Sequence, residues 1–305
     1  MKRILKNEFM LKNCRLCARN CSVNRIEGKT GFCRSTDKLK IARAALHQWE
    51  EPCISGNRGS GTVFFTSCSL DCVFCQNHCI SQENSGREIS IKRLSEIFLE
   101  LQDQKAHNIN LVTPTHFVPQ IIEAIKGARD MGLTLPVVYN TSSYDNIETI
   151  RALEGYVDIY LPDLKYYNDK YAIKYSKVKN YFNTASKAIE EMVRQTGKPV
   201  FDDKGMMKKG VIIRHMMLPG LLFDSKKVID YIYNKYGDKV YISLMNQYTP
   251  YNKASQYPEI NKKLSKKHYD GLINYALELG VKNGFIQEEG TCSESFIPPF
   301  DNTGV

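Results

Sequence analysis

Short apolar runs alternate with longer amphipathic stretches along most of this 305-residue chain. Runs rich in β-branched and aromatic residues predict strands at 62–67, 109–112, 135–139, 157–161, 210–218 and 239–245. Between them, apolar residues at helical spacing predict helices at 91–104, 118–130, 184–195, 225–236 and 266–279. Asp145 and Glu148 have the pattern of a capping box that opens one more helix. Strands that alternate with helices in this way predict a mainly parallel α/β fold.

Polar residues accompany the end of each predicted strand. Cysteines follow the first strand, and the later strands bring Thr113 and Thr115, Asn140, Thr141 and Ser142, Asp163 and Lys165, His215, and Asn246 and Gln247. Parallel strands carry their carboxyl ends to one edge, so we expect these side chains to share a mouth. Solvated loop polarity explains any one of them, but it explains six in succession poorly.

Two of these positions allow a sharper expectation. Asp163 and Lys165 lie two apart on extended chain, so both should face the barrel interior; a surface ion pair is the alternative. His215 lies inside a strand, where a buried histidine with satisfied hydrogen bonds is favoured over a catalytic one.

Composition excludes several classes of protein. Hydrophobic residues make up 42% and charged residues 25%, which excludes disordered, collagen and coiled-coil chains. No apolar run reaches the length of a membrane span, and the first residues lack the apolar core of a secretory signal, so we expect a soluble, cytoplasmic protein. The net charge of +9 is spread along the chain and forms no concentrated stripe for nucleic acid. A diffuse positive charge suits an acidic electron donor.

Ten cysteines carry the chemical signal. Eight of them form two groups, Cys14, Cys17, Cys21 and Cys33, then Cys68, Cys72, Cys75 and Cys79, and only Cys53 and Cys292 stand apart. Thiols clustered in this way in a reducing compartment indicate metal binding and not a disulfide framework.

The second group follows a predicted strand. The spacing of Cys68, Cys72 and Cys75 suits three corners of an iron–sulfur cubane and leaves one iron open for a substrate or cofactor. Phe74 places an aromatic ring beside whatever binds there. A zinc knuckle with Cys79 as fourth ligand is the alternative. A fourth protein ligand would close the open iron, so we expect Cys79 to stay off the cluster.

This arrangement resembles the C-x3-C-x2-C signature of the radical S-adenosylmethionine (SAM) superfamily. Segments 49–56, 59–65, 75–77, 110–116, 139–143 and 161–165 are similar to a branch related to the pyruvate formate-lyase activating enzymes, and the resemblance covers residues 10–305. It implies a (β/α)6 partial TIM-type barrel over residues 56–305, preceded by a small cysteine-rich metal-binding extension over residues 1–55.

The resemblance also implies roles for particular residues. Cys68, Cys72 and Cys75 would hold a [4Fe-4S] cluster. The cofactor-binding residues would be Phe74, Thr113, Thr115, Asn140, Thr141, Asp163 and Lys165. Asn140 stands where an aspartate is usual, which weakens a monovalent-cation assignment. The segment 113–115 replaces a common Gly-Gly-Glu, so backbone carbonyls or threonine hydroxyls would hold the methionyl amino group.

The N-terminal group, Cys14, Cys17, Cys21 and Cys33, has few large apolar residues around it. Such a segment folds by binding metal, and we expect one closed structural centre here. Zinc and a second Fe–S cluster are both compatible with four thiolates, and four free thiols are the remaining alternative.

We therefore expect an anaerobic radical SAM oxidoreductase that cleaves SAM reductively to a 5′-deoxyadenosyl radical, with a flavodoxin- or ferredoxin-type electron donor. By resemblance, the radical removes hydrogen from a glycine of a glycyl-radical enzyme. Radical modification of another peptide or of a small molecule is the first alternative. A non-catalytic Fe–S or zinc binding module is the second.

Overall fold

The computed structural model describes residues 9–287 and 298–305 of the chain. Ten strands of this part form one sheet in the order β10-β9-β8-β6-β5-β4-β2-β1-β3, and β7 pairs with β8. The central strands run parallel from β2 through to β10. Their bounds are β2 Ser60–Phe65, β4 Ile109–Val112, β5 Val137–Thr141, β6 Ile159–Pro162, β8 Met207–Met216, β9 Tyr241–Met245 and β10 Gly284–Ile286.

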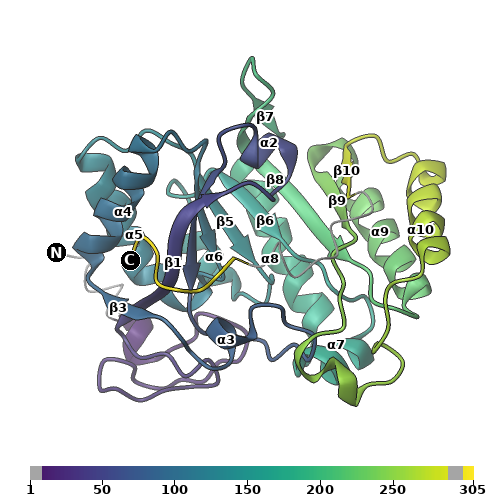
Figure 1. Cartoon of the computed structure of the whole chain (residues 1–305), viewed down its shortest axis with the longest axis horizontal. Helices are drawn as coiled ribbons and strands as arrows, with labels where there is room; N and C mark the ends of the chain where they lie inside the picture. Colours follow the sequence, from purple (N-terminus) through teal and green to yellow (C-terminus); the bar gives the residue numbers. More distant parts are fainter. Residues whose placement is uncertain (1–8, 288–297) are drawn as a thin grey trace.

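The predicted α/β barrel is confirmed, with each predicted strand within three residues of an observed one. Helices pack around the sheet (Figure 1). Five of them match the helices predicted from periodicity: α4 Ile91–Asp103, α5 Val118–Asp130, α8 Tyr181–Thr196, α9 Leu222–Tyr236 and α10 Lys266–Leu279. The helix expected to open near Asp145 is α6 Ile147–Ala152, and the shorter helices α2 Pro52–Ser55, α3 His78–Ser81 and α7 Asp169–Ser176 were not predicted.

Sequence reasoning missed the outer strands. β1 (Leu39–His47) pairs antiparallel with β2, and β3 (Arg87–Ile89) pairs with the start of β1. The short strands β7 (Val200–Phe201) and β10 were also missed. Residues 298–305 run beside β1, where Ala44 N donates to Thr303 O at 2.9 Å (Figure 1). The first part of the chain therefore contributes a strand to the barrel sheet.

The capping-box prediction was wrong. Helix α6 begins after Asn146, and no side-chain cap bond is formed there. Asp145 is instead buried, and its carboxylate accepts hydrogen bonds from Tyr139 Oη at 2.9 Å and Thr141 Oγ1 at 2.7 Å. Two hydroxyl donors on β5 compete successfully for the carboxylate, because a buried charge needs partners more than an exposed helix end does.

One end of the barrel is closed by the short helix α2. Ile54 of α2 is fully buried and packs with Val138, Leu161 and Ile212 from three barrel strands. Asn108 Nδ2 donates to Ile54 O at 2.8 Å, which ties the helix to the start of β4. Helix α2 lies at the amino-terminal ends of the strands, so a functional site has room only at their carboxyl-terminal ends.

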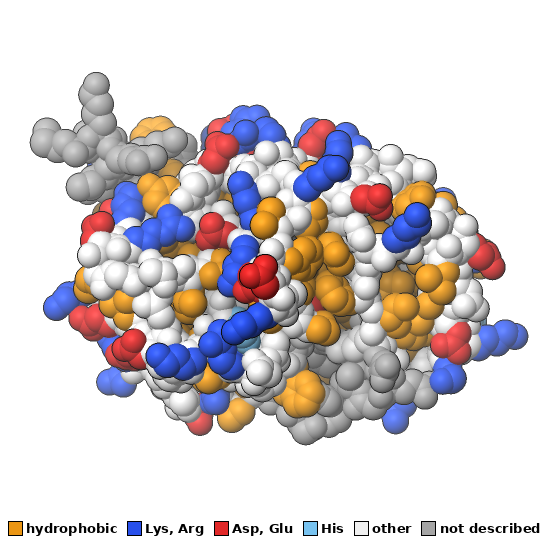
Figure 2. Space-filling view, turned by 90° about the horizontal axis from the view of Figure 1, so that it is seen from above, with side chains coloured by type: hydrophobic (Ala, Val, Ile, Leu, Met, Phe, Trp, Pro, Cys, Tyr) orange, Lys and Arg blue, Asp and Glu red, His pale blue; other side chains and the backbone are white. Residues whose placement is uncertain are grey.

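The surface carries charges of both signs. Lysine and arginine side chains are spread over the face seen in Figure 2 and are interspersed with acidic ones, while apolar side chains gather near its centre. None of the helices in residues 9–287 and 298–305 has the length and apolar character needed to cross a membrane.

Candidate functional site

A cavity of about 400 Å³ lies at the carboxyl ends of the barrel strands. Five different segments bring predicted site residues to its wall. These residues are Cys72, Phe74, Cys75, Thr113, Asn140, Asp163, Lys165 and Gln247. The prediction that strand ends would share one polar mouth is therefore confirmed for these positions, and the cavity contains both thiols and charged groups.

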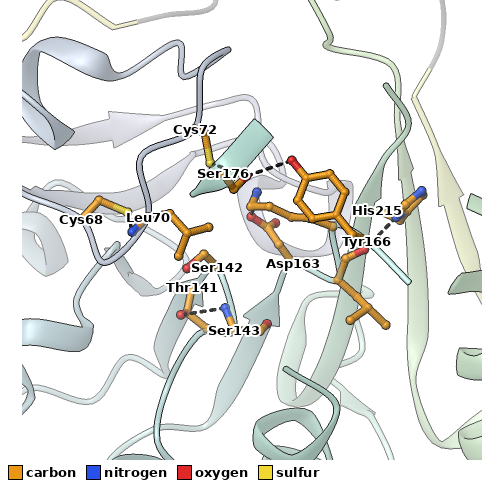
Figure 3. A network of polar contacts seen from close by, with 12 residues as sticks. Cys68, Leu70, Cys72, Thr141, Ser142, Ser143, Asp163, Tyr166, Ser176 and His215 are labelled. Atoms are coloured by element: carbon orange, nitrogen blue, oxygen red, sulfur yellow. Dashed lines mark hydrogen bonds and ion pairs between the residues drawn. The ribbon is translucent and has the colours of Figure 1, made fainter. Parts of the chain in front are cut away.

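The loop after β2 carries Cys68, Cys72 and Cys75. Hydrogen-bonding groups face all three sulfurs: Leu70 N donates to Cys68 Sγ at 3.4 Å, Ser176 Oγ lies 3.1 Å from Cys72 Sγ, and Ser81 Oγ lies 3.2 Å from Cys75 Sγ, so both hydroxyls can donate once the thiols have lost their protons. Figure 3 shows Cys68 and Cys72 on this loop, with Ser176 beside Cys72. Donors aimed at sulfur stabilise thiolates, which are the form that binds metal.

Burial raises the pKa of all three thiols, that of Cys72 to about 11. For Cys72 the positive charge of Lys165 opposes this effect. Without a metal the thiols therefore stay protonated at neutral pH. Binding iron in place of these protons would release the protons and satisfy the buried sulfurs.

Asp163 and Lys165 face the same cavity, as predicted from their spacing. Lys165 Nζ lies 2.5 Å from Asp163 Oδ2. Burial alone would lower the Lys165 pKa, but the negative charge of Asp163 and its hydrogen bond to Lys165 outweigh this effect, and the pKa is raised. Lys165 is therefore cationic at neutral pH, beside the cysteine loop.

Of the predicted site residues in the segments after β4 and at the end of β5, two line the cavity and two lie behind its wall. Thr113 and Asn140 line the cavity, and Thr113 N donates to Asn140 O at 2.9 Å. Thr115 and Thr141 are buried behind them, with their hydroxyl oxygens 3.5 Å apart, and neither lines the cavity. Backbone near Thr113 adopts a positive φ of 59°, which turns the chain sharply after β4.

His215 is buried and points away from the cavity. Its Nδ1 lies 2.7 Å from Leu164 O (Figure 3), and burial lowers its pKa to about 4. The imidazole is therefore neutral at pH 7, and Nδ1 donates to the carbonyl. Its contact holds the segment that precedes Lys165. The prediction of a buried histidine is confirmed, but Nε2 has no hydrogen-bond partner among the described residues, so only one of the two ring nitrogens is satisfied.

Residues 62–232 match the family described as the Radical SAM superfamily, which is more than half of the chain. The chain belongs to the radical SAM superfamily. Membership implies a [4Fe-4S] cluster and SAM as cofactors, with SAM cleavage by radical chemistry at the cluster. The uncharacterized protein MJ0674 of Methanocaldococcus jannaschii is 34% identical over 289 residues, which cover 92% of this chain and 77% of that protein.

Solved structures share the radical SAM fold at low sequence identity. SuiB of Streptococcus suis bound to S-adenosylmethionine aligns with a TM-score of 0.51 and 13% identity over 74% of this chain and 49% of SuiB. The hydrogenase maturase HydG of Carboxydothermus hydrogenoformans aligns with a TM-score of 0.51 and 14% identity over 78% of this chain and 55% of HydG. Methylornithine synthase PylB aligns with a TM-score of 0.50 and 13% identity over 78% of this chain and 68% of PylB. This chain spans about half the length of SuiB and HydG.

The cysteine loop of this radical SAM protein fits the cluster that the family implies. Each of its three partly buried sulfurs has a hydrogen-bonding partner, and burial, which the charge of Lys165 only partly offsets at Cys72, raises the pKa of the thiols. Cys79, by contrast, packs against the apolar cluster of Ala42, Phe64 and Ile80 and does not line the cavity. Of the three predicted ligands, Cys72 and Cys75 line the cavity, and Cys68 lies on the same loop, four residues before Cys72.

A buried ion-pair network in the wall of the radical SAM cavity was missed by sequence reasoning. Arg214 of β8 donates from Nε to Glu51 Oε1 at 2.8 Å and from Nη2 to carboxylate oxygens of both Glu50 and Glu51. Glu50 also accepts from Asn110 Nδ2 at 2.8 Å. The acidic pair lies in a segment quoted for its family resemblance, but nothing local indicated a partner 163 residues away.

The N-terminal segment packs directly on the radical SAM barrel. Arg25 is fully buried and donates to the carbonyls of Thr36 and His116, and its Nη1 lies 3.9 Å from Cys14 Sγ. His116 follows Thr115 directly, and its ring lies 2.6 Å from Thr66 O. This buried arginine therefore connects the first cysteine to the strand ends that form the site.

The four N-terminal cysteines affect one another electrostatically. Burial raises the pKa of Cys17 to about 12, and the charges of Cys33, Cys14 and Cys21 add to the shift. Within the residues that the structure describes, no three or more His, Cys, Asp or Glu side chains are grouped to hold a single metal ion. That absence does not bear on a [4Fe-4S] cluster, because each thiolate of a cubane binds a different iron. The N-terminal metal centre therefore stays a prediction.

Two cysteines lie outside both groups. Cys53 of α2 lines a separate cavity of about 500 Å³ together with His107 and Tyr241, at the opposite end of the barrel. Burial raises the pKa of Cys53 to about 12, so it is an inert thiol at neutral pH. Cys292 lies outside the described residues.

Proposed function

We propose that this protein reductively cleaves SAM at a [4Fe-4S] cluster held by Cys68, Cys72 and Cys75, and that it abstracts hydrogen from a glycine of a glycyl-radical enzyme. The observation that carries the first part is one cavity that contains the cysteine loop and the Asp163–Lys165 pair. A cluster and a zwitterionic cofactor need thiolates, an acid and a base within reach of one another.

When bound, the cluster supplies the electron that breaks the sulfonium bond of SAM and so generates the 5′-deoxyadenosyl radical. The chain's own groups bind and orient. Lys165 is a half-buried cation whose Nζ can hold the methionyl carboxylate, and Asp163 can accept from an amino or hydroxyl group. The cavity wall of Phe74, Met216 and Met245 excludes water from the reacting centre.

Support for a polypeptide target comes from the resemblance to the activating-enzyme branch and from the shape of the cavity. A side cavity of about 190 Å³ adjoins the first one and shares Trp49, Glu50, Arg214 and Gln247 with it. Trp49 is 57% exposed at this opening. Two adjoining cavities with an exposed tryptophan in their shared wall suit a glycine carried on a loop of a second protein, with a small one-electron carrier as reductant.

The test of this function uses protein purified and reconstituted without oxygen. We expect iron and sulfide at the level of at least one cubane, and release of 5′-deoxyadenosine from SAM under a chemical reductant. Zinc analysis in the same samples identifies the N-terminal metal. A glycyl-radical EPR signal on addition of a glycyl-radical protein would support the target, and deoxyadenosine without that signal would favour another substrate. No deoxyadenosine from cluster-loaded protein would contradict the proposal.

Replacing Asp163 or Lys165 by alanine should weaken SAM binding and leave iron content unchanged. Each variant loses a charged hydrogen bond to the cofactor, worth about 1.5–3 kcal/mol, or roughly 10- to 150-fold in Kd. Equilibrium binding of SAM to the reconstituted variants measures the effect. Lys174→Ala is the control, because Lys174 pairs with Glu259 at the surface. Wild-type affinity in both site variants would place the pair outside the cofactor site.

A further inference from the structure

Arg19 joins two parts of the site that are distant in sequence. It lies between Cys17 and Cys21 in the N-terminal segment. Its Nε donates to Ser69 O at 2.9 Å, inside the loop between the first two cluster cysteines. Its Nη2 donates to Lys177 O at 2.6 Å, just after helix α7. One guanidinium therefore holds the cysteine loop and the end of α7 together.

The two segments that Arg19 joins meet at Cys72. Asp71 N donates to Ser176 O at 3.2 Å and Val73 N donates to Tyr175 O at 2.9 Å, so the loop runs along the last turn of α7. Ser176 also contacts the Cys72 sulfur through its hydroxyl (Figure 3). Arg19 thus supports the same loop–helix contact that places this sulfur.

The end of α7 is a favourable place for an arginine. Lys177 ends the helix in a left-handed conformation with φ of 56°. Carbonyls at a helix C-terminus lack intrahelical partners and carry the negative end of the helix dipole. A guanidinium, which has only hydrogen-bond donors and a positive charge, therefore stabilises the helix end when it donates to them. The two bonds from Arg19 are charge-assisted and fixed in direction by the planar group.

Arg19 is itself held in place by two aromatic rings. Its Cζ lies 3.5 Å from the centre of the Phe32 ring and 5.8 Å from that of Tyr144. The neighbouring Ala18 N donates to Tyr144 O at 3.2 Å. An arginine packed between two rings loses little freedom when it forms its hydrogen bonds, so it can fix the position of the groups that it contacts.

We propose that Arg19 is a positioning residue for the iron–sulfur cluster, through which the N-terminal cysteine segment sets the geometry of the loop that carries Cys68 and Cys72. Arg19 acts through the backbone of Ser69 and Lys177. The inference rests on the proposed function, because it takes that loop as the holder of the cluster. It makes the N-terminal extension a direct support of the radical site and not a separate module.

The experiment compares Arg19→Ala and Arg19→Lys with Arg15→Ala in full-length, anaerobically reconstituted protein. Arg15 is the matched control, because it is exposed and its Nε donates to Ser22 Oγ within its own segment. Iron content, the EPR spectrum of the reduced cluster with and without SAM, and the rate of deoxyadenosine formation are measured for each.

We expect Arg19→Ala to bind iron but to show an altered EPR spectrum of the reduced cluster with SAM. The rate of deoxyadenosine formation should fall by about ten-fold, which corresponds to the loss of at least one charged hydrogen bond. Arg19→Lys keeps one charged donor and should recover part of both. Arg15→Ala should match the wild type. A wild-type spectrum in Arg19→Ala would overturn the proposal, whether or not the rate falls, because the cluster would then be unaffected by Arg19.

Should Arg19→Ala fail to fold, Phe32→Leu decides, since it removes the ring on Arg19 and leaves both donors in place. A spectrum shifted in the same sense supports positioning, and an unchanged spectrum overturns it. Failure of the proposed function has a different signature. In that case the cluster-loaded wild type forms no deoxyadenosine, while the EPR spectrum of the cluster still reports whether Arg19 positions the loop.

Discussion

Replacing Cys68, Cys72 and Cys75 together by alanine should remove the iron–sulfur cluster and all formation of 5′-deoxyadenosine. Each sulfur has a hydrogen-bond donor in the structure, and two of the three thiols line the site cavity. The buried loop offers no other thiol on the cavity wall. Iron and sulfide analysis, together with loss of the brown colour, measures the first effect, and product analysis measures the second.

Cys79→Ala is the matched control for this triple variant. Cys79 lies only four residues after Cys75, but it packs against Ala42, Phe64 and Ile80 and is absent from the cavity wall. We expect wild-type iron content and activity in this variant. If Cys79→Ala loses the cluster and the triple variant keeps it, the assignment of the three ligands is wrong.

Replacing Arg214 by methionine should lower the free energy of unfolding by about 3–5 kcal/mol, the usual cost of removing one partner from a buried ion pair. The side chains of Arg214, Glu50 and Glu51 are each less than one-tenth exposed. Methionine fills a similar volume but leaves two buried carboxylates without a cation. Urea unfolding with linear extrapolation measures the change. Lys92→Met, which breaks an exposed pair with Glu96, should cost less than about 0.5 kcal/mol.

The pH dependence of this difference identifies its source. Burial alone would raise the pKa of Glu51, but the charge of Arg214 outweighs burial and lowers it. In the wild type, the stabilisation from Glu51 is therefore present above its ordinary pKa of 4.5 and is lost as the pH falls through the lower folded value. In Arg214→Met the charge that outweighed burial is gone, so the pKa of Glu51 rises, and protonation of Glu51 at lower pH reduces the destabilisation. The stability difference should narrow toward pH 4.5, and a constant difference would exclude the carboxylates as its cause.

Local pattern predicted the central strands and long helices because each is fixed by its own sequence. Alternating apolar runs and helical periodicity depend on neighbours within one or two turns. β1 lacked such a signal, since its segment Leu39–His47 contains three alanines and two charged residues and is covered on both sides by other parts of the chain. Asp145 had a clear local signal, but its partners on β5 overrode it.

By itself, the sequence determined the ligand loop and the direction of Asp163 and Lys165. Cysteines four and three residues apart can reach one cluster whatever the rest of the chain does, and residues two apart on a strand share a face. Only the tertiary structure decided which side chains support them. Arg214 meets Glu50 across 164 residues, and Arg19 meets Lys177 across 158. Such partners leave no trace in local spacing, because folding, not chain connectivity, brings them within hydrogen-bond distance.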